Sequence, residues 1–317
     1  MLPLFLTALA FAGTYGVPVD GYPSADERSV VLWTNAARVD PAGFPDDYSA
    51  GGCSTDDFSE DELTPKAPLY VDLDLTEVAR VHSSDMVDNG CFQHESCDGT
   101  DAWTRIGEYY TDASTALGEN IAAGYGTART TVLSGWMCSH EGHRANIMSG
   151  DFNEMGAGVD SDTMTQDFAG GELVEGAPPV RMAVLEDGTY YADWGDDAAP
   201  AVLSIVRDGR STPMAMEWGA EENGIYTVSS AAQDDTASDH SWYVSWQTAA
   251  GGAGAFPAVG AFDDAGGYTE DSVQPVGGDD VGLKLVGCAT VRSGATWGVL
   301  GLAVCMAWTR RRSTLGA

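Results

Sequence analysis

Basic residues are scarce in this chain. Its 317 residues include 15 lysines and arginines against 48 aspartates and glutamates, which gives a formal net charge of -33. A surface with this excess of negative charge repels phosphate backbones and anionic headgroups. Nucleic acid is therefore excluded as a partner, and the charge is typical of an exported protein that must stay soluble.

Long apolar runs are missing from the body of the chain and occur only at its ends. Residues 1–12 combine an apolar run with a small-x-small ending, which predicts a signal peptide, although no Lys or Arg precedes the run. Residues 293–309 are apolar and precede a basic tail at 310–317, so they predict a transmembrane span or a segment similar to bacterial sorting tails. We therefore expect an exported protein at the cell surface or outer membrane, anchored in the membrane by its C-terminal span.

Cysteine is also uncommon, and four of the six cysteines lie between the two terminal segments. An even number in an oxidising compartment suggests two disulfides, and four cysteines allow three pairings. We expect Cys91 to pair with Cys97, and Cys53 with Cys138. The alternative is a metal cluster, because Cys91, His94 and Cys97 have ligand-like spacing.

The remaining sequence divides near residues 170–179, where GGELVEGAPP interrupts the pattern with turn-forming residues. Before this break, residues 24–170 predict helices followed by strands. Ser24 is expected to cap a helix that ends near Val39, and Asp74 to cap a second helix. Further helices are expected at 102–109 and 128–138, and strands at 153–160 and 164–169.

After the break, turn dipeptides alternate with short apolar runs. Asp187-Gly188, Asp208-Gly209 and Asn223-Gly224 each lie between such runs and predict hairpin turns. Residues 180–265 are therefore expected to form an antiparallel β-sandwich of immunoglobulin or fibronectin type. A Gly- and acid-rich stalk at 266–292 would connect it to the membrane.

Four blocks between Cys91 and Asp167 carry the most specific information. They are CFQHESCDGT (91–100), LGENIA (117–122), WMCSHEGHRANIM (136–148) and FNEMGAGVD (152–160). In this order they resemble the CAP superfamily, or SCP domains, which groups cysteine-rich secretory, antigen 5 and pathogenesis-related proteins, and here the bacterial type. The resemblance implies an α+β fold in residues 24–170, with a sheet sandwiched between helices.

The resemblance also implies a polar cleft. Its residues would be His94, Glu119 and His143, and in some family members the histidines bind a divalent metal. The family's second acid is replaced here by Ser139. Two imidazoles and one carboxylate with an open fourth position would allow zinc to polarise a water molecule. Alternatively, Glu119 holds the two histidines in a buried network that fixes the surrounding loops.

These observations favour a binding protein over an enzyme. We expect the cleft to take an extracellular small ligand, lipid, peptide or cell-wall fragment, with a divalent metal such as zinc as the one candidate cofactor. The alternatives are a metal-dependent hydrolase of peptides or cell-wall polymers and a purely adhesive surface protein.

Overall fold

The computed structural model describes residues 19, 21, 23–112, 114, 116–140, 142–171, 177–232 and 241–269. The predicted signal peptide, most of the stalk, the apolar segment at 293–309 and the basic tail lie outside these residues, so they stay predictions. Within the described residues, no helix has both the length and the apolar character needed to cross a membrane.

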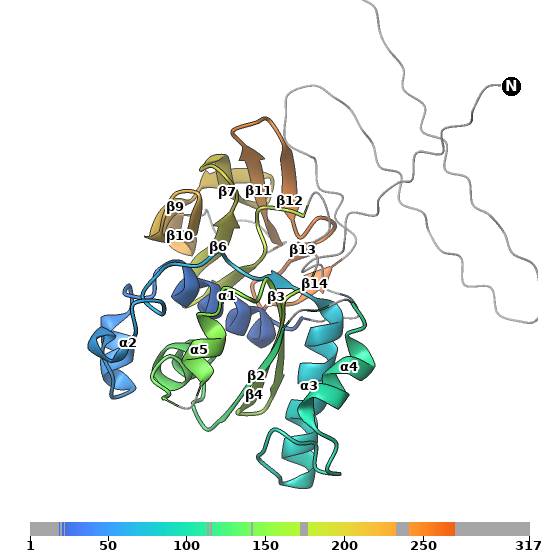
Figure 1. Cartoon of the computed structure of the whole chain (residues 1–317). Coiled ribbons are helices and arrows are strands. Elements are labelled where there is room, and N and C mark those ends of the chain that lie inside the picture. The colour runs from blue at the N-terminus through green and yellow to red at the C-terminus, as the bar shows by residue number, and fades with distance from the viewer. Residues whose placement is uncertain are drawn as a thin grey trace, which may run out of the picture. The chain divides into compact units, whose positions relative to one another are not determined.

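The first part of the chain is built on a four-stranded sheet with the order β1-β3-β4-β2. Strand β1 pairs in parallel with β3, and the other neighbours are antiparallel. The bounds of the strands are β1 Tyr70–Val71, β2 Leu117–Ala123, β3 Glu154–Asp160 and β4 Thr163–Ala169. Helices cover both faces of this sheet (Figure 1).

Adjacent residues of β4 show how the two faces differ. The hydroxyl of Thr165 accepts a hydrogen bond of 2.9 Å from Ser83 in helix α3 (Leu73–Asn89). The next residue, Gln166, donates to Thr34 in helix α1 (Ala25–Val39). Because successive side chains of a strand point to opposite faces, α3 and α1 lie on opposite sides of the sheet. The predicted mixed α+β architecture of this part is confirmed.

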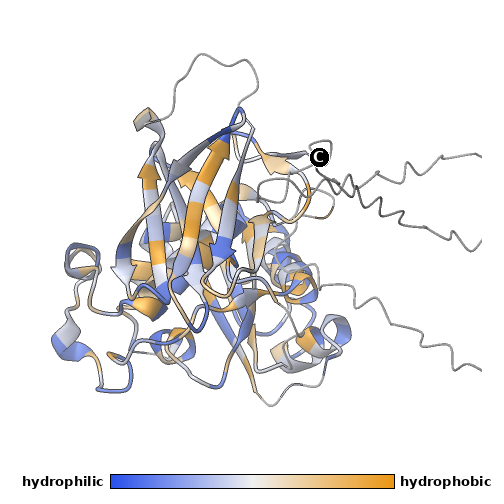
Figure 2. Ribbon diagram, turned by 90° about the horizontal axis from the view of Figure 1, so that it is seen from above, coloured by the Kyte–Doolittle hydropathy of each residue, from blue (hydrophilic) through white to orange (hydrophobic). Residues whose placement is uncertain are grey.

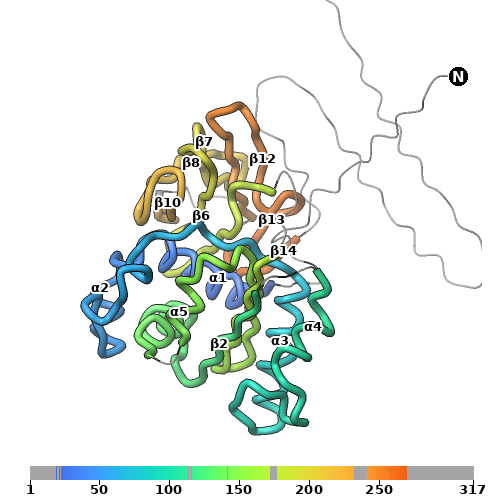
Figure 3. Tube along the Cα trace, viewed as in Figure 1, coloured from blue at the N-terminus to red at the C-terminus, as the bar shows by residue number. Residues whose placement is uncertain are grey.

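Helix α1 begins where the sequence predicts. The Ser24 side chain accepts from the Glu27 backbone, and the Glu27 side chain accepts from the Ser24 backbone, which forms a capping box. Every residue from Glu27 to Val39 is buried, because α1 lies between the sheet of the first part and the β-rich second part (Figure 3).

Helix α3 begins earlier than predicted. Its cap is Asp72, whose carboxylate accepts a hydrogen bond of 2.8 Å from the Leu75 backbone, so the assignment of Asp74 as the cap is wrong. Asp74 also suits a first turn, since acids stabilise the helix N-terminus, and sequence alone did not separate the two roles. Gly156 and Gly158 of β3 allow α3 to lie close, because a Cβ at either position would overlap the α3 backbone.

Helix α4 spans Ala102–Tyr109, as predicted. The helix expected at 128–138 is present in a different form, since Thr130–Trp136 (η2) has π-helical hydrogen bonding. In the described residues of the first part, three short helices had no counterpart in the sequence prediction, because each has at most six residues and no clear period. They are α2 (Pro45–Ala50), η1 (Thr55–Asp57) and α5 (His143–Ile147).

The second part is rich in strands, and all its described strand pairs are antiparallel. One sheet has the order β5-β6-β10-β9, and the other has the order β14-β13-β11-β7-β8, with β12 beside β11. The bounds are β5 Ala183–Glu186, β6 Thr189–Gly195, β7 Pro200–Arg207, β8 Arg210–Pro213, β9 Ala215–Gly219, β10 Asn223–Ser229, β11 Trp242–Thr248, β12 Ala253–Phe256, β13 Ala261–Phe262 and β14 Tyr268–Thr269, with a short helix η3 at Ser230–Ala232.

Two of the three predicted hairpin turns are confirmed. Asp187-Gly188 connects β5 to β6 and Asp208-Gly209 connects β7 to β8, and all four residues have positive φ. The turn predicted at Asn223-Gly224 is wrong. Asn223 is already the first residue of β10 and pairs with Gly195 of β6, while the chain reverses just before it through hydrogen bonds between Ala220 and Asn223.

Aromatic side chains join the two sheets of the second part. Tyr190 of β6 meets Trp242 of β11 at 5.0 Å between ring centroids, and Trp194 meets Trp246 at 6.5 Å. In the view of Figure 2, several strands carry bands of hydrophobic residues beside paler or hydrophilic ones. The immunoglobulin or fibronectin type and the domain boundaries stay predictions. The described residues of both parts belong to one compact unit with a continuous apolar core.

Candidate functional site

Glu119 and Asn120 are neighbours on β2 and serve opposite faces of the sheet. Glu119 is buried, and its side chain contacts residues of α3, α4 and the loop that joins them. Asn120 donates to Gln166 at 3.0 Å and to the carbonyl of His143 at 3.1 Å on the other face. Because successive side chains of a strand point to opposite faces, Glu119 and Asn120 take part in two separate groups of contacts.

The centre of the first group is the pair Glu119 and His94. Oε1 of Glu119 lies 2.7 Å from Nδ1 of His94, and Oε2 accepts from the buried guanidinium of Arg105. Burial alone would raise the pKa of Glu119, but the hydrogen bond from His94 and the charge of Arg105 outweigh burial and lower the pKa. The same hydrogen bond raises the pKa of His94. Glu119 is therefore ionised, and Nδ1 of His94 carries the proton.

Asp167 lies directly across from Glu119, because β2 and β4 pair in antiparallel register. It is completely buried, and neither carboxylate oxygen has a hydrogen-bond partner within the described part of the chain. Burial first, and then the negative charge of Glu119, raise the pKa of Asp167 well above its usual value. Asp167 is therefore a neutral acid beside an ionised one.

His82 of α3 completes the surroundings of Glu119. It is fully buried; its Nε2 lies 3.1 Å from the carbonyl of Gln93 and 3.9 Å from Oε1 of Glu119. Burial lowers the pKa of His82, so this imidazole is neutral at physiological pH. His82 is therefore a hydrogen-bonded core residue.

The loop that carries His94 is fixed by covalent and polar contacts rather than by secondary structure. It runs between α3 and α4 and is closed by a disulfide between Cys91 and Cys97. The backbone N–H of Cys97 donates to Asp85 of α3 at 2.7 Å. A second disulfide joins Cys53 to Cys138. These are the two pairs expected from the sequence, so these four cysteines do not offer thiolates to a metal.

His143 belongs to the second group of contacts. It is the first residue of α5, and its Nδ1 lies 2.9 Å from the hydroxyl of Ser139. The nearby amide of Asn146 donates to Oδ1 of Asn120 at 2.9 Å and to the carbonyl of Glu119 at 3.2 Å. The predicted cleft residues therefore form two pairs, His94 with Glu119 and His143 with Ser139, which meet at β2.

A metal held by His94, Glu119 and His143 requires three ligand atoms close together. In the described part of the chain, the one trio of candidate ligands within 4.8 Å of one another is Asp85, Cys91 and Cys97, and its two sulfurs form a disulfide. Both oxygens of Glu119 are also engaged by other side chains. The geometry does not fit a metal bound by all three predicted ligands, and zinc binding itself stays a prediction.

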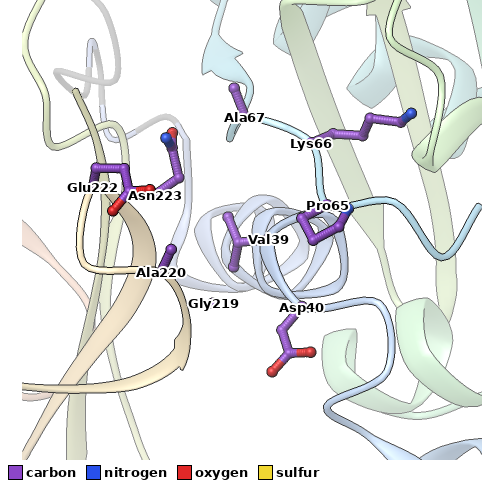
Figure 4. Close-up of a pocket in the computed structure, with 9 residues that line it drawn as sticks. All are labelled: Val39, Asp40, Pro65, Lys66, Ala67, Gly219, Ala220, Glu222 and Asn223. Carbon is purple, nitrogen blue, oxygen red and sulfur yellow. The ribbon is translucent and has the colours of Figure 1, made fainter. Parts of the chain in front are cut away.

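Two hollows in the described part of the chain lie outside this site. One has a volume of 350 Å³ and lies at the end of α1, between the loop at 65–67 and the turn from β9 to β10 (Figure 4). The other has a volume of 440 Å³ and is lined by residues of β7, β9 and β10. Neither is lined by His94, Glu119, Ser139 or His143.

Arg105, Asp167 and His82 are site residues that motif reasoning did not include. Arg105 lies in the helix predicted at 102–109 and Asp167 in the strand predicted at 164–169, and neither was predicted to belong to the site. The cross-strand register supplies the missing signal for Asp167, since pairing Leu117 with Ala169 places Glu119 opposite Asp167. Chemically, the site offers a half-exposed imidazole backed by a buried carboxylate and, separately, a hydroxyl hydrogen-bonded to an imidazole.

Comparison with known proteins agrees with this architecture. Residues 33–170 match the model of the CAP family, described as the cysteine-rich secretory protein family, so this segment is a CAP domain. The chain is 39% identical over 102 residues to the uncharacterized membrane protein YlbC of Bacillus subtilis (strain 168). It is also 39% identical over 105 residues to the uncharacterized protein YkwD of the same organism. Each alignment covers 32% of this chain, with 29% of YlbC and 40% of YkwD.

Three solved structures have some similarity to part of this chain. An extracellular protein containing a SCP domain from Bacillus anthracis str. Ames has 36% identity and a TM-score of 0.30, over 32% of this chain and 33% of that chain. An outer surface protein from Borrelia burgdorferi has 22% identity and a TM-score of 0.29, over 33% and 78%. A cysteine-rich secretory protein from Staphylococcus aureus subsp. aureus Mu50 has 19% identity and a TM-score of 0.28, over 41% and 38%.

Proposed function

We propose that this protein, whose residues 33–170 form a CAP domain, is exported and binds an extracellular ligand at the His94–Glu119 pair. The ligand is a small molecule, lipid, peptide or cell-wall fragment. The apolar segment at 293–309 anchors the protein in the membrane and keeps the CAP domain outside the cytoplasm. The apolar ends of the chain and the acidic composition support export.

One observation carries the binding role. The side chain of His94 is 50% exposed, whereas that of Glu119 beneath it is 2% exposed. Nδ1 of His94 is hydrogen-bonded to Glu119, whereas Nε2 of His94 has no hydrogen-bond partner among the described residues. A histidine fixed through one nitrogen presents the other in a defined direction, which is the arrangement that a binding or proton-transfer site requires.

The test is a binding titration followed by NMR of the His94 imidazole in the purified full-length chain. The probes are soluble peptidoglycan fragments, vesicles of phosphatidylcholine with phosphatidylglycerol, and a defined mixture of short peptides. We expect one probe class to shift the His94 signals in a saturable way and to lose most of its affinity in His94→Ala. His140→Ala is the matched control, since it removes another exposed histidine.

The proposal fails if no probe shifts the His94 signals, or if His94→Ala binds each probe as well as the wild type does. A calorimetric titration with zinc alone, after removal of metal, tests the cofactor separately. Binding that vanishes in both His94→Ala and His143→Ala would mean that the two pairs rearrange around the ion. Zinc binding that persists in both variants would place the ion elsewhere.

Hydrolysis is the second candidate function, and one contact favours it. The Ser139 hydroxyl lies 2.9 Å from Nδ1 of His143, within reach for proton transfer from a nucleophile to a base. An esterase or peptidase assay with a chromogenic substrate should then lose activity in Ser139→Ala and in His143→Ala. Equal rates in the wild type and both variants would exclude a hydrolase that uses this pair. If the protein is instead purely adhesive, its binding to surfaces should be the same in His94→Ala as in the wild type.

A further inference from the structure

The loop between α3 and α4 has no regular structure around His94, yet it holds this side chain against a carboxylate on β2. The disulfide restrains the ends of the segment 91–97, but it does not determine where His94 points. Polar contacts from the helices must provide that control. Arg105 of α4 makes such contacts with both the loop and Glu119.

The Arg105 side chain is 4% exposed. Its Nη1 donates to the carbonyl of His94 and to the hydroxyl of Ser96, each at 3.0 Å. Its Nη2 donates to Oε2 of Glu119, while Oε1 of the same carboxylate binds His94. One guanidinium therefore holds the backbone of His94 and the carboxylate that holds its side chain.

We propose that Arg105 is the positioning residue of the His94 site. Its planar fork sets the distance between the loop and β2, and this distance keeps Nδ1 of His94 on Glu119 and leaves Nε2 turned outward. Lysine has the same charge but lacks the rigid fork, so it cannot reproduce the three contacts together. This inference rests on the proposed role of His94 in binding, and it concerns how that site is built.

A role through charge alone gives a different expectation. If Arg105 merely neutralises the charge of Glu119, any buried cation at this position preserves the site. Arg105→Lys then separates the two explanations, and Arg105→Met removes charge and fork together. Arg129→Met is the matched control, because Arg129 is another arginine that is hydrogen-bonded to a carboxylate, that of Asp47, at 3.0 and 2.9 Å.

The readout is the tautomer of His94, measured from imidazole nitrogen shifts of the full-length chain at alkaline pH, where the ring is neutral. In the wild type and in Arg129→Met we expect a single form with the proton on Nδ1. In Arg105→Lys we expect this form to be lost in favour of the mixture of a free imidazole. Arg105→Met should show the same loss if it folds, and Arg105→Lys decides the question if Arg105→Met does not fold.

A wild-type tautomer in Arg105→Lys would overturn the positioning role and leave charge as the explanation. The tautomer is independent of any ligand, so the two proposals fail separately. An ordered His94 that binds none of the probes would refute the proposed function but not the positioning role. Binding that survives a disordered tautomer in Arg105→Lys would show that the ligand does not depend on this orientation.

Discussion

Glu119, Asp167 and Arg105 place two carboxyl groups and one guanidinium in the same buried space. Glu119 is the ionised partner of Arg105, and Asp167 is neutral because burial and the charge of Glu119 oppose its ionisation. Replacing Glu119 with glutamine removes that opposing charge while Arg105 stays in place. We therefore predict that Asp167 ionises in Glu119→Gln and becomes the counter-ion of Arg105.

The expected magnitudes follow from this exchange of roles. Asp167→Asn removes an acid that has no hydrogen-bond partner among the described residues, so unfolding free energy should change by less than about 1 kcal/mol. Glu119→Gln loses charged hydrogen bonds but keeps a counter-ion, and should cost about 2 kcal/mol. The double variant leaves Arg105 buried without any carboxylate, which should cost about 3–5 kcal/mol.

The assay is urea unfolding at neutral pH of the wild type, both single variants and the double variant. The two single effects sum to about 2 kcal/mol, so the cycle should show a coupling energy of about 2 kcal/mol, beyond the roughly 0.5 kcal/mol that independent sites show. Strictly additive effects would refute the reasoning, because they would mean that Asp167 does not replace Glu119. The cost of Glu119→Gln should also grow as the pH falls, since protonation of Asp167 then removes the substitute charge.

Three further predictions concern stability. A fragment that ends at Gly171 should not unfold cooperatively in urea, because α1 loses its cover from the second part, and a sharp transition would contradict this. Burial raises the pKa of Asp193 to about 6, so folding is favoured while this acid is protonated. The unfolding free energy should therefore fall by about 3 kcal/mol as the pH rises from about 4 through 6. The fall should persist in high salt, which screens surface repulsion, and an unfolding free energy that does not change with pH would exclude this role of Asp193. The double variant Cys53→Ser with Cys138→Ser should lower the unfolding free energy by about 4–5 kcal/mol in denaturation assays, whereas loss of the Cys91–Cys97 disulfide should lower it by about 2 kcal/mol. The difference is expected because the first disulfide closes a far longer loop (85 against 6 residues), and equal costs would contradict this.

Much of the secondary structure was predictable because its signals are local. The helix cap at Ser24 and the two Asp-Gly turns depend only on neighbouring residues, and both were predicted correctly. The third turn failed because Asn223-Gly224 has the same local chemistry but is paired with β6. A strand partner distant in sequence determines its structure, and no dipeptide signal contains that partner.

The candidate site shows the same limit. The motifs identified His94, Glu119, Ser139 and His143, and each lies in one of the two pairs that meet at β2. The order of the motifs could not predict which residues pair with each other. Glu119 lies on one face of β2, while the neighbouring Asn120 donates to the carbonyl of His143 on the other face. Arg105 reaches the site only through the packing of α4 against the loop, which has no sequence signature of its own.

The position of α1 also bears on what the second part does for the site. Asn35 of α1 donates to Asp193 of β6 at 2.7 Å, and both side chains are fully buried. The preceding residue, Thr34, accepts from Gln166 of β4, which in turn accepts from Asn120 beside Glu119. Buried polar groups keep such bonds because an unpaired group costs about 1–3 kcal/mol. The second part therefore holds α1 in place, and α1 is in turn hydrogen-bonded to β4. In this way the second part stabilises the sheet of the CAP domain.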